Sequence, residues 1–130
     1  MEGWWDTAHE FTGYPNVQWV PRTYAMGPLY AANDLLLVPS QVEDPFPRVI
    51  AEAGFHGVAT LGSDRGGIPE AVGDGGLILD PDDVDARVQA VGSADRAGLG
   101  AKARARAVPL ARPCLPELAA AGLIPAAAAI

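Results

Sequence analysis

The stretch VEDPFPRVIAEAGFHG, residues 42–57, joins a loop rich in proline and acid to an amphipathic segment. Its apolar residues follow the i, i+3, i+4, i+7 spacing of one helix face: Phe46, Val49, Ile50 and Ala53. We expect the helix to begin at Pro47, because the proline ring disfavours helical dihedrals at the residue before it. The amides of Arg48 and Val49 then lack intrahelical partners and face outward, where the helix dipole favours an anion such as phosphate.

Three charged side chains surround this helix start. Glu52 lies about one and a half turns into the helix, and its carboxylate can accept two hydrogen bonds from the vicinal diol of a ribose or a sugar. Asp44, in the preceding loop, can reach the same space. Arg48 either adds a guanidinium to the phosphate seat or lies along the surface in solvent, and both remain open. Either acid taken alone is more often a solvated surface residue or a helix cap.

Short apolar runs on both sides of this stretch predict buried strands. The strongest is ANDLLLVPS at 32–40, followed by GVATLGS at 57–63 and GGLILD at 75–80, with a weaker run, NVQWV, at 16–20. Continuous apolar runs bounded by turn residues are typical of strands that are buried on both faces. Their spacing of about 20 residues leaves room for a helix between strands, which predicts an α/β fold with a parallel sheet and flanking helices.

Two further segments have helical character. IPEAV at 68–72 has a proline near its start, and PDDVDARVQAV at 81–91 opens with proline and acids and carries Val84, Val88 and Val91 on one face. The pair Gly66 and Gly67 precedes the first of them and follows a predicted strand. Because ligands of such folds bind at the carboxyl ends of the strands, the missing Cβ atoms would allow a bound group to approach the backbone. A tight turn alone could also require two glycines.

Composition restricts the possible partners. The 130 residues, 49% of them apolar, suffice for one domain. A net charge of −7 without a basic stripe disfavours nucleic acid and anionic membranes. A single cysteine, Cys114, excludes a disulfide within the chain and a multi-cysteine zinc site, and it fits a reducing compartment. No signal sequence or transmembrane segment is evident, so a cytoplasmic location is expected.

The chain divides into three predicted segments. Residues 1–15 form an irregular N-terminal segment, residues 16–92 the α/β unit, and residues 93–130 an Ala- and Pro-rich tail. From Gly98 onward the repeated prolines predict helical fragments only and poor order.

The central motifs resemble a known family. LYAANDLLLVPS followed by residues 44–83 resembles the nucleotide-sugar-binding C-terminal domain of retaining GT-B glycosyltransferases of the group 1 or family 4 type. That family carries two acids separated by seven residues (E-x7-E), followed by a Gly-Gly-x-Pro-Glu loop. Here Asp44 and Glu52 have this separation, and the second motif is reproduced by Gly66, Gly67, Pro69 and Glu70. The resemblance implies a partial Rossmann-like domain, the C-terminal half-domain of GT-B.

The resemblance also implies roles for individual residues. Glu52 matches the residue that binds the ribose hydroxyls of a nucleotide-sugar donor, and Asp44, the candidate catalytic residue, matches the acid that contacts the donor sugar. Pro47, Arg48 and Val49 match the backbone that faces the diphosphate, and Gly66 and Gly67 match the loop close to the donor. Enzymes of this type transfer a hexose from the donor to an acceptor, here unknown, without a metal ion or other cofactor.

Three departures from the family limit these implications. Asp44 is one methylene shorter than the usual Glu, and Pro47 replaces a common Gly, which removes one amide donor. The resemblance covers residues 16–83 only, whereas the family needs an acceptor domain and basic phosphate-binding residues upstream. We therefore expect a truncated or split form that is inactive alone, with a partner chain possible. His9 and His56 are expected to be solvated or packed and not catalytic.

Two alternatives remain. The chain can be a non-catalytic nucleotide-binding or protein-interaction module whose exposed sheet edge pairs with a partner. It can also be a fragment of a GT-B-like sugar-nucleotide epimerase whose remaining active-site groups lie elsewhere. The sequence specifies neither the nucleotide base nor the sugar nor the acceptor.

Overall fold

The structure is a computed structural model that describes residues 13–111 and Ala120. The elements follow in the order α1 (Met26–Ala31), β1 (Leu35–Val38), α2 (Arg48–Phe55), β2 (Ala59–Ser63), α3 (Ile68–Val72), β3 (Gly76–Leu79), α4 (Val84–Ser93), α5 (Arg96–Ala107) and a 3-10 helix, η2 (Val108–Ala111). Residues 1–12, 112–119 and 121–130, which include His9 and Cys114, lie outside the described residues, so the predictions made for them are untested.

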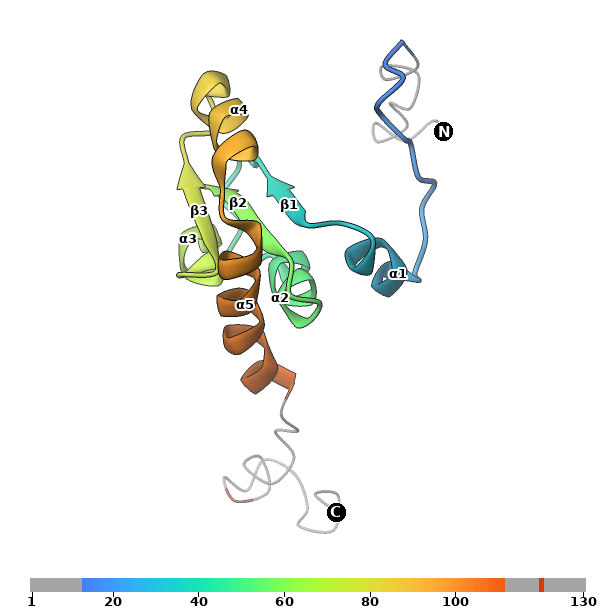
Figure 1. Cartoon of the computed structure of the whole chain (residues 1–130). Helices are drawn as coiled ribbons and strands as arrows, with labels where there is room; N and C mark the ends of the chain where they lie inside the picture. The colour runs from blue at the N-terminus through green and yellow to red at the C-terminus, as the bar shows by residue number, and fades with distance from the viewer. Residues whose placement is uncertain (1–12, 112–119, 121–130) are drawn as a thin grey trace, which may run out of the picture.

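The strands form a parallel sheet in the order β1-β2-β3. The register aligns Leu37 with Leu61 and Leu61 with Leu77. Helix α2 connects β1 to β2, and α3 connects β2 to β3 (Figure 1). All five residues of the central strand are buried. The predicted α/β fold with a parallel sheet and flanking helices is confirmed.

The main core lies on one face of this sheet. Its buried residues come from one strand and two helices: Val38, Ile50, Ile68 and Val72. A second cluster joins α1 to α2 and to the start of β2: Tyr30, Ala53 and Val58. Because alternate strand residues face opposite sides, Leu37 belongs to the other face, where it is 54% exposed. This second face is covered over the central strand, where Ala59 and Leu61 are buried, and is open at Leu37.

Helix α5 contradicts the expectation of helical fragments only from Gly98 onward. It runs for 12 residues, and its N-cap Asp95 accepts a hydrogen bond from the Gly98 amide at 3.0 Å. It packs against α2 and β2 with a stripe of small residues: Gly100, Ala103 and Ala107. Alanine has the highest helix propensity, and this stripe has helical spacing, so the Ala-rich composition favoured a helix over disorder. The division into three segments otherwise stays a prediction.

Smaller differences concern the boundaries and exposure of the other elements. Helix α2 begins at Arg48, and Pro47 is its extended N-cap, one position from the expected start. The run 16–20 is exposed and carries no strand. Val84 and Val88 share a face as expected, but they are 60% and 66% exposed and line a shallow apolar cavity with Leu37.

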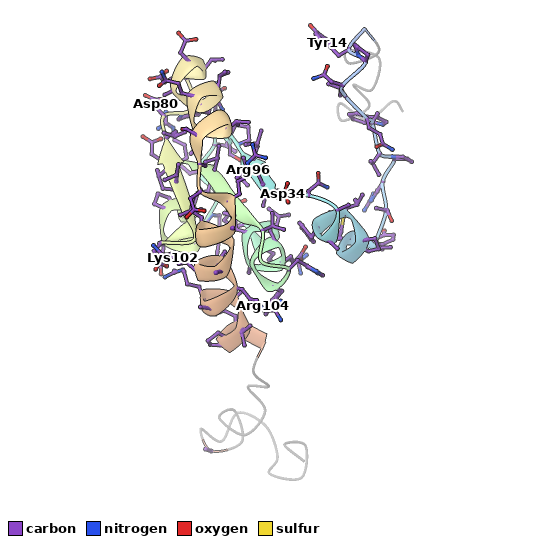
Figure 2. All side chains as sticks on the ribbon, viewed as in Figure 1. Tyr14, Asp34, Asp80, Arg96, Lys102 and Arg104 are labelled. Atoms are coloured by element: carbon purple, nitrogen blue, oxygen red, sulfur yellow. The ribbon has the colours of Figure 1, made fainter. Side chains whose placement is uncertain are left out.

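Two arginines of α5 bind the C-terminal ends of other helices. Arg104 Nη1 donates a hydrogen bond to the carbonyl oxygen of Phe55 in α2 at 2.7 Å, and Arg106 Nη2 donates to that of Glu70 in α3 at 2.9 Å. Carbonyls in the last turn of a helix lack intrahelical partners, and cations there also interact favourably with the helix dipole. Figure 2 shows Arg104 on the side of α5 that faces α2, with Lys102 on the other side.

The two glycines of the β2–α3 loop bring this loop against the loop that carries Asp44. The Gly67 amide donates to the carbonyl oxygen of Asp44 at 2.7 Å. A Cβ atom on Gly66, which has a φ of 55°, would overlap the Asp44 backbone, and one on Gly67 would overlap the carbonyl oxygen of Pro45. The sequence predicted that a bound group approaches these glycines closely. In the structure, the backbone of residues 44 and 45 makes this approach.

Replacing Arg104 by alanine should lower the free energy of unfolding by about 1 kcal/mol, because the Phe55 carbonyl loses its partner. The matched control is Lys102→Ala on the same helix, whose ammonium group makes no hydrogen bond or ion pair with the described residues and whose loss should change stability by less than about 0.5 kcal/mol. Urea unfolding followed by circular dichroism measures both. Equal losses in the two variants would contradict the role assigned to Arg104.

The variant Gly67→Ala should be less stable by about 2 kcal/mol, because its methyl group overlaps the Pro45 carbonyl and forces the two loops apart. Gly92→Ala in α4 is the control, since nothing lies within 4 Å of the added Cβ. That substitution should stabilise the chain by about 0.5 kcal/mol through helix propensity. Thermal unfolding of both variants tests the contrast, and an unchanged Gly67→Ala protein would refute the close loop contact.

Candidate functional site

A groove between α1 and α2 brings together the two predicted acids and the predicted helix start. Its volume is about 680 Å³, and the predicted residues that line it are Asp44, Pro47, Arg48, Val49 and Glu52. The opposite wall comes from α1 and the segment before it: Thr23, Tyr24, Met26, Gly27 and Tyr30. Gly66 and Gly67 do not line it; they pack against the backbone of the loop that carries Asp44.

The amino end of α2 opens onto this groove. Pro47 has extended dihedrals, with a φ of −71° and a ψ of 111°, and its carbonyl accepts the Ile50 amide at 3.1 Å. The first-turn amides of Arg48 and Val49 are then available to an anion, as in other helix N-termini. Arg48 is exposed, and its guanidinium makes no hydrogen bond or ion pair with residues 13–111. The positive end of the helix and one cation therefore share this part of the groove.

Glu52 is half-buried, and a residue that sequence reasoning missed holds one of its oxygens. The hydroxyl of Tyr30 donates a hydrogen bond to Glu52 Oε2 at 3.0 Å. Burial, the hydrogen bond to Glu52 and its negative charge, in that order, raise the pKa of Tyr30 to about 12. The Tyr30 side chain is 6% exposed, so its ring belongs to the core while its hydroxyl reaches the groove.

His56 packs against the other side of this arrangement. Its imidazole stacks on the Tyr30 ring with a centroid distance of 5.6 Å and an interplanar angle of 23°. It is exposed, lines the groove and lies next to α1, where a Cβ on Gly27 would be 3.7 Å from His56 Cε1. The expectation of a packed or solvated histidine describes this environment.

Asp44 is held in a defined position at the groove. Its Oδ1 accepts a hydrogen bond from the Phe46 amide at 3.0 Å, which closes an Asx turn. Its carbonyl accepts from Gly67. Glu70, the last residue of the second motif, lies elsewhere and lines a separate cavity of about 280 Å³ that also involves Ile50 and Arg106. The structure thus joins Asp44 to Glu52 in one groove and leaves Glu70 outside it.

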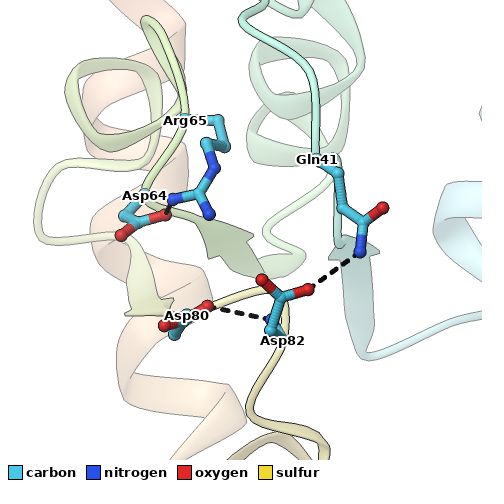
Figure 3. A network of polar contacts seen from close by, with 5 residues as sticks. All are labelled: Gln41, Asp64, Arg65, Asp80 and Asp82. Carbon is cyan, nitrogen blue, oxygen red and sulfur yellow. Dashed lines mark hydrogen bonds and ion pairs between the residues drawn. The ribbon is translucent and has the colours of Figure 1, made fainter.

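At the carboxyl ends of the strands, one polar contact joins the loops after β1 and β3, and two others lie within single loops (Figure 3). Gln41 Nε2 after β1 donates to Asp82 Oδ1 after β3 at 2.9 Å. Asp80 Oδ1 accepts the Asp82 amide at 2.9 Å, and Arg65 pairs with its neighbour Asp64. All these contacts are solvent-exposed, so they order the loops but contribute little to stability.

The described residues contain neither a cluster of metal ligands nor a membrane-spanning helix. Among them, no group of three or more His, Cys, Asp or Glu side chains is arranged to hold a metal ion. No helix in the same part of the chain has the length and apolar character needed to cross a membrane.

Comparison with known proteins gives consistent results. The family model of the glycosyl transferases group 1 matches residues 3–94, more than half of the chain and more than the expected 16–83. The chain is 52% identical over 46 residues to a lipopolysaccharide 1,2-N-acetylglucosaminetransferase of Salmonella typhimurium. It also matches the structure of sucrose-phosphate synthase from Thermosynechococcus elongatus, with a TM-score of 0.56 and 32% sequence identity over 65% of this chain.

The matches are partial on the side of the relatives. The aligned region spans 12% of the Salmonella protein and 23% of the synthase chain. Within that region the parallel sheet with flanking helices corresponds to part of the GT-B fold. On the motifs, the fold and the family match, the chain belongs to the group 1 glycosyltransferases.

Proposed function

We propose that the groove between α1 and α2 binds a nucleotide-sugar donor and that the chain is the donor-binding part of a retaining hexosyltransferase. The observation that carries this proposal is the convergence of Asp44, the amino end of α2 and Glu52 on one groove. The amino end of α2 would bind the diphosphate of such a donor, Glu52 its ribose and Asp44 its sugar.

The spacing along α2 supports this assignment. Glu52 follows Arg48 by four residues, which corresponds to one turn and about 6 Å along the helix axis. A diphosphate seated on the first-turn amides would therefore have its ribose beside Glu52. The Tyr30 hydroxyl donates a hydrogen bond to Oε2 of this carboxylate. Oε1 makes no hydrogen bond with the described residues, so it can accept one from a ribose hydroxyl. Asp44, in the loop before the helix, would contact the donor sugar.

The chemistry follows from the same groups. When the sugar leaves, negative charge develops on the diphosphate, and the α2 dipole together with Arg48 would stabilise it. No metal ion is required in this mechanism. The names of the relatives indicate that the family handles sugars of different kinds, so we leave the sugar, the base and the acceptor unassigned.

Transfer also needs groups that these residues do not supply. Because the chain spans only a small share of its relatives, the acceptor site and further phosphate-binding cations would come from a longer protein or from a partner chain that completes the domain. The isolated 130 residues would then bind a donor without transferring its sugar. A fragment of a GT-B-like sugar-nucleotide epimerase would share this donor site.

A non-catalytic interaction module is the second candidate. It is favoured by β1, which is an edge strand of the sheet and carries Leu37 at 54% exposure. The unpaired backbone groups of this edge strand, next to the exposed Leu37 side chain, can pair with a strand of another chain. In this case partner binding would not depend on Glu52.

Replacing Glu52 by glutamine should weaken donor binding about 10- to 100-fold, because a charged acceptor of ribose hydroxyls becomes neutral. Isothermal titration with UDP-glucose, UDP-N-acetylglucosamine, ADP-glucose and GDP-mannose identifies the donor that binds best and measures the loss. Glu43→Gln is the control, since Glu43 is an exposed acid of the loop before α2 that does not line the groove. Equal affinities in the Glu52 variant and the original chain would refute the proposed site and favour the interaction module.

The purified 130-residue chain should bind the donor equally well with and without EDTA, because its phosphates are held by helix amides and Arg48 and not by a metal ion. The same sample should release no sugar to an acceptor when radiolabelled donor is incubated with glucose, sucrose and lipopolysaccharide core. Transfer of the sugar by this chain alone would refute the prediction that the 130 residues are inactive without further groups. A loss of donor affinity in EDTA would disprove the metal-free site.

A further inference from the structure

The hydrogen bond between Tyr30 and Glu52 connects two helices across the groove. The two residues are 22 positions apart, and the 3.0 Å contact links α1 to the middle of α2. The Tyr30 ring is buried with Ala53, the residue next to Glu52, and with Val58 at the start of β2. The hydroxyl is thus fixed relative to the backbone that carries the carboxylate.

The Tyr30 ring is held on both sides. The cluster with Ala53 and Val58 buries it, and the imidazole of His56 stacks on it at 5.6 Å. Gly27, one turn earlier in α1, lies beside His56 with room for a Cβ at ordinary contact distance. A ring restrained in this way has little rotamer freedom left, so its hydroxyl is a fixed donor.

We propose that Tyr30 is a positioning residue that orients the Glu52 carboxylate for a ribose diol. The inference rests on the donor site proposed above. With Oε2 held by the Tyr30 hydroxyl, the side chain of Glu52, which lines the groove, keeps one orientation and leaves Oε1 for the ribose. A glutamate without this contact would have to lose the freedom of three rotatable bonds when the ligand binds.

The donor of this hydrogen bond keeps its proton near neutral pH. The Tyr30 phenol stays protonated because burial and the neighbouring carboxylate raise its pKa to about 12. The unfolded phenol ionises near pH 10, so stability from this group is fully present below that pH and is lost only as the pH rises from about 10 to about 12. The contact therefore acts as a constant constraint and not as a switch near neutral pH.

The variant Tyr30→Phe isolates the hydroxyl, since it keeps the ring that packs on Ala53 and His56. Binding is measured for uridine, adenosine and guanosine diphosphates and for their 2′,3′-dideoxy analogues, which lack the diol. We expect about a tenfold loss of affinity for the preferred ribonucleoside diphosphate and no change for its dideoxy analogue. Tyr14→Phe is the control, because Tyr14 is 60% exposed and does not line the groove.

The outcomes separate this inference from the donor site itself. If Tyr30→Phe loses affinity equally for both ligands, the residue has a structural role only, and the inference is overturned. Unchanged affinity for both, or failure of Tyr30→Phe to fold, also overturns it while leaving the donor site in place. If the original chain binds none of the three diphosphates, the proposed function itself fails, and the role of Tyr30 fails with it.

Discussion

The contact between α2 and α5 depends on side chains no larger than a methyl group. A Cβ on Gly54 would lie 2.9 Å from both the Ala103 carbonyl oxygen and the Ala107 Cβ, so only glycine fits at this point of α2. Ala53, the preceding residue, has no exposed surface at all. Close packing of this kind fixes a helix in position because any shift along the contact produces overlap. The amino end of α2 and the position of Glu52 follow from this placement.

The other wall of the groove depends on α2 in turn. Helix α1 has six residues and no side-chain N-cap, and a helix of that length is not stable by itself in water. Its position comes from the cluster that Tyr30 forms with Ala53 and Val58. The width of the groove is therefore set by packing that begins at the α2–α5 contact and ends at the Tyr30 ring. A substitution at Gly54 would alter the groove although Gly54 itself does not line it.

The parallel sheet could be predicted because its strands are continuous apolar runs bounded by turn residues, and the structure has strands at 35–38, 59–63 and 76–79. Helix α5 was not indicated by hydrophobic periodicity, because its packed stripe consists of Gly100, Ala103 and Ala107, and only its alanine content favoured a helix. The spacing of Asp44 and Glu52 predicted that they share one space. Tyr30 was missed because its partner is 22 residues away and no local pattern connects them.

The shorter acid at position 44 has a structural reason in this loop. The Asp44 carboxylate accepts the Phe46 amide at 3.0 Å, and an Asx turn of this type needs a side chain with one methylene. A glutamate would carry its carboxylate past that amide and leave it without a local partner. The contact of the Asp44 carbonyl with Gly67 adds a second restraint on the same loop. Aspartate at this position therefore has a shorter reach toward the groove but a fixed position, so the sugar of the proposed donor would have to approach it more closely than it would approach the family's glutamate.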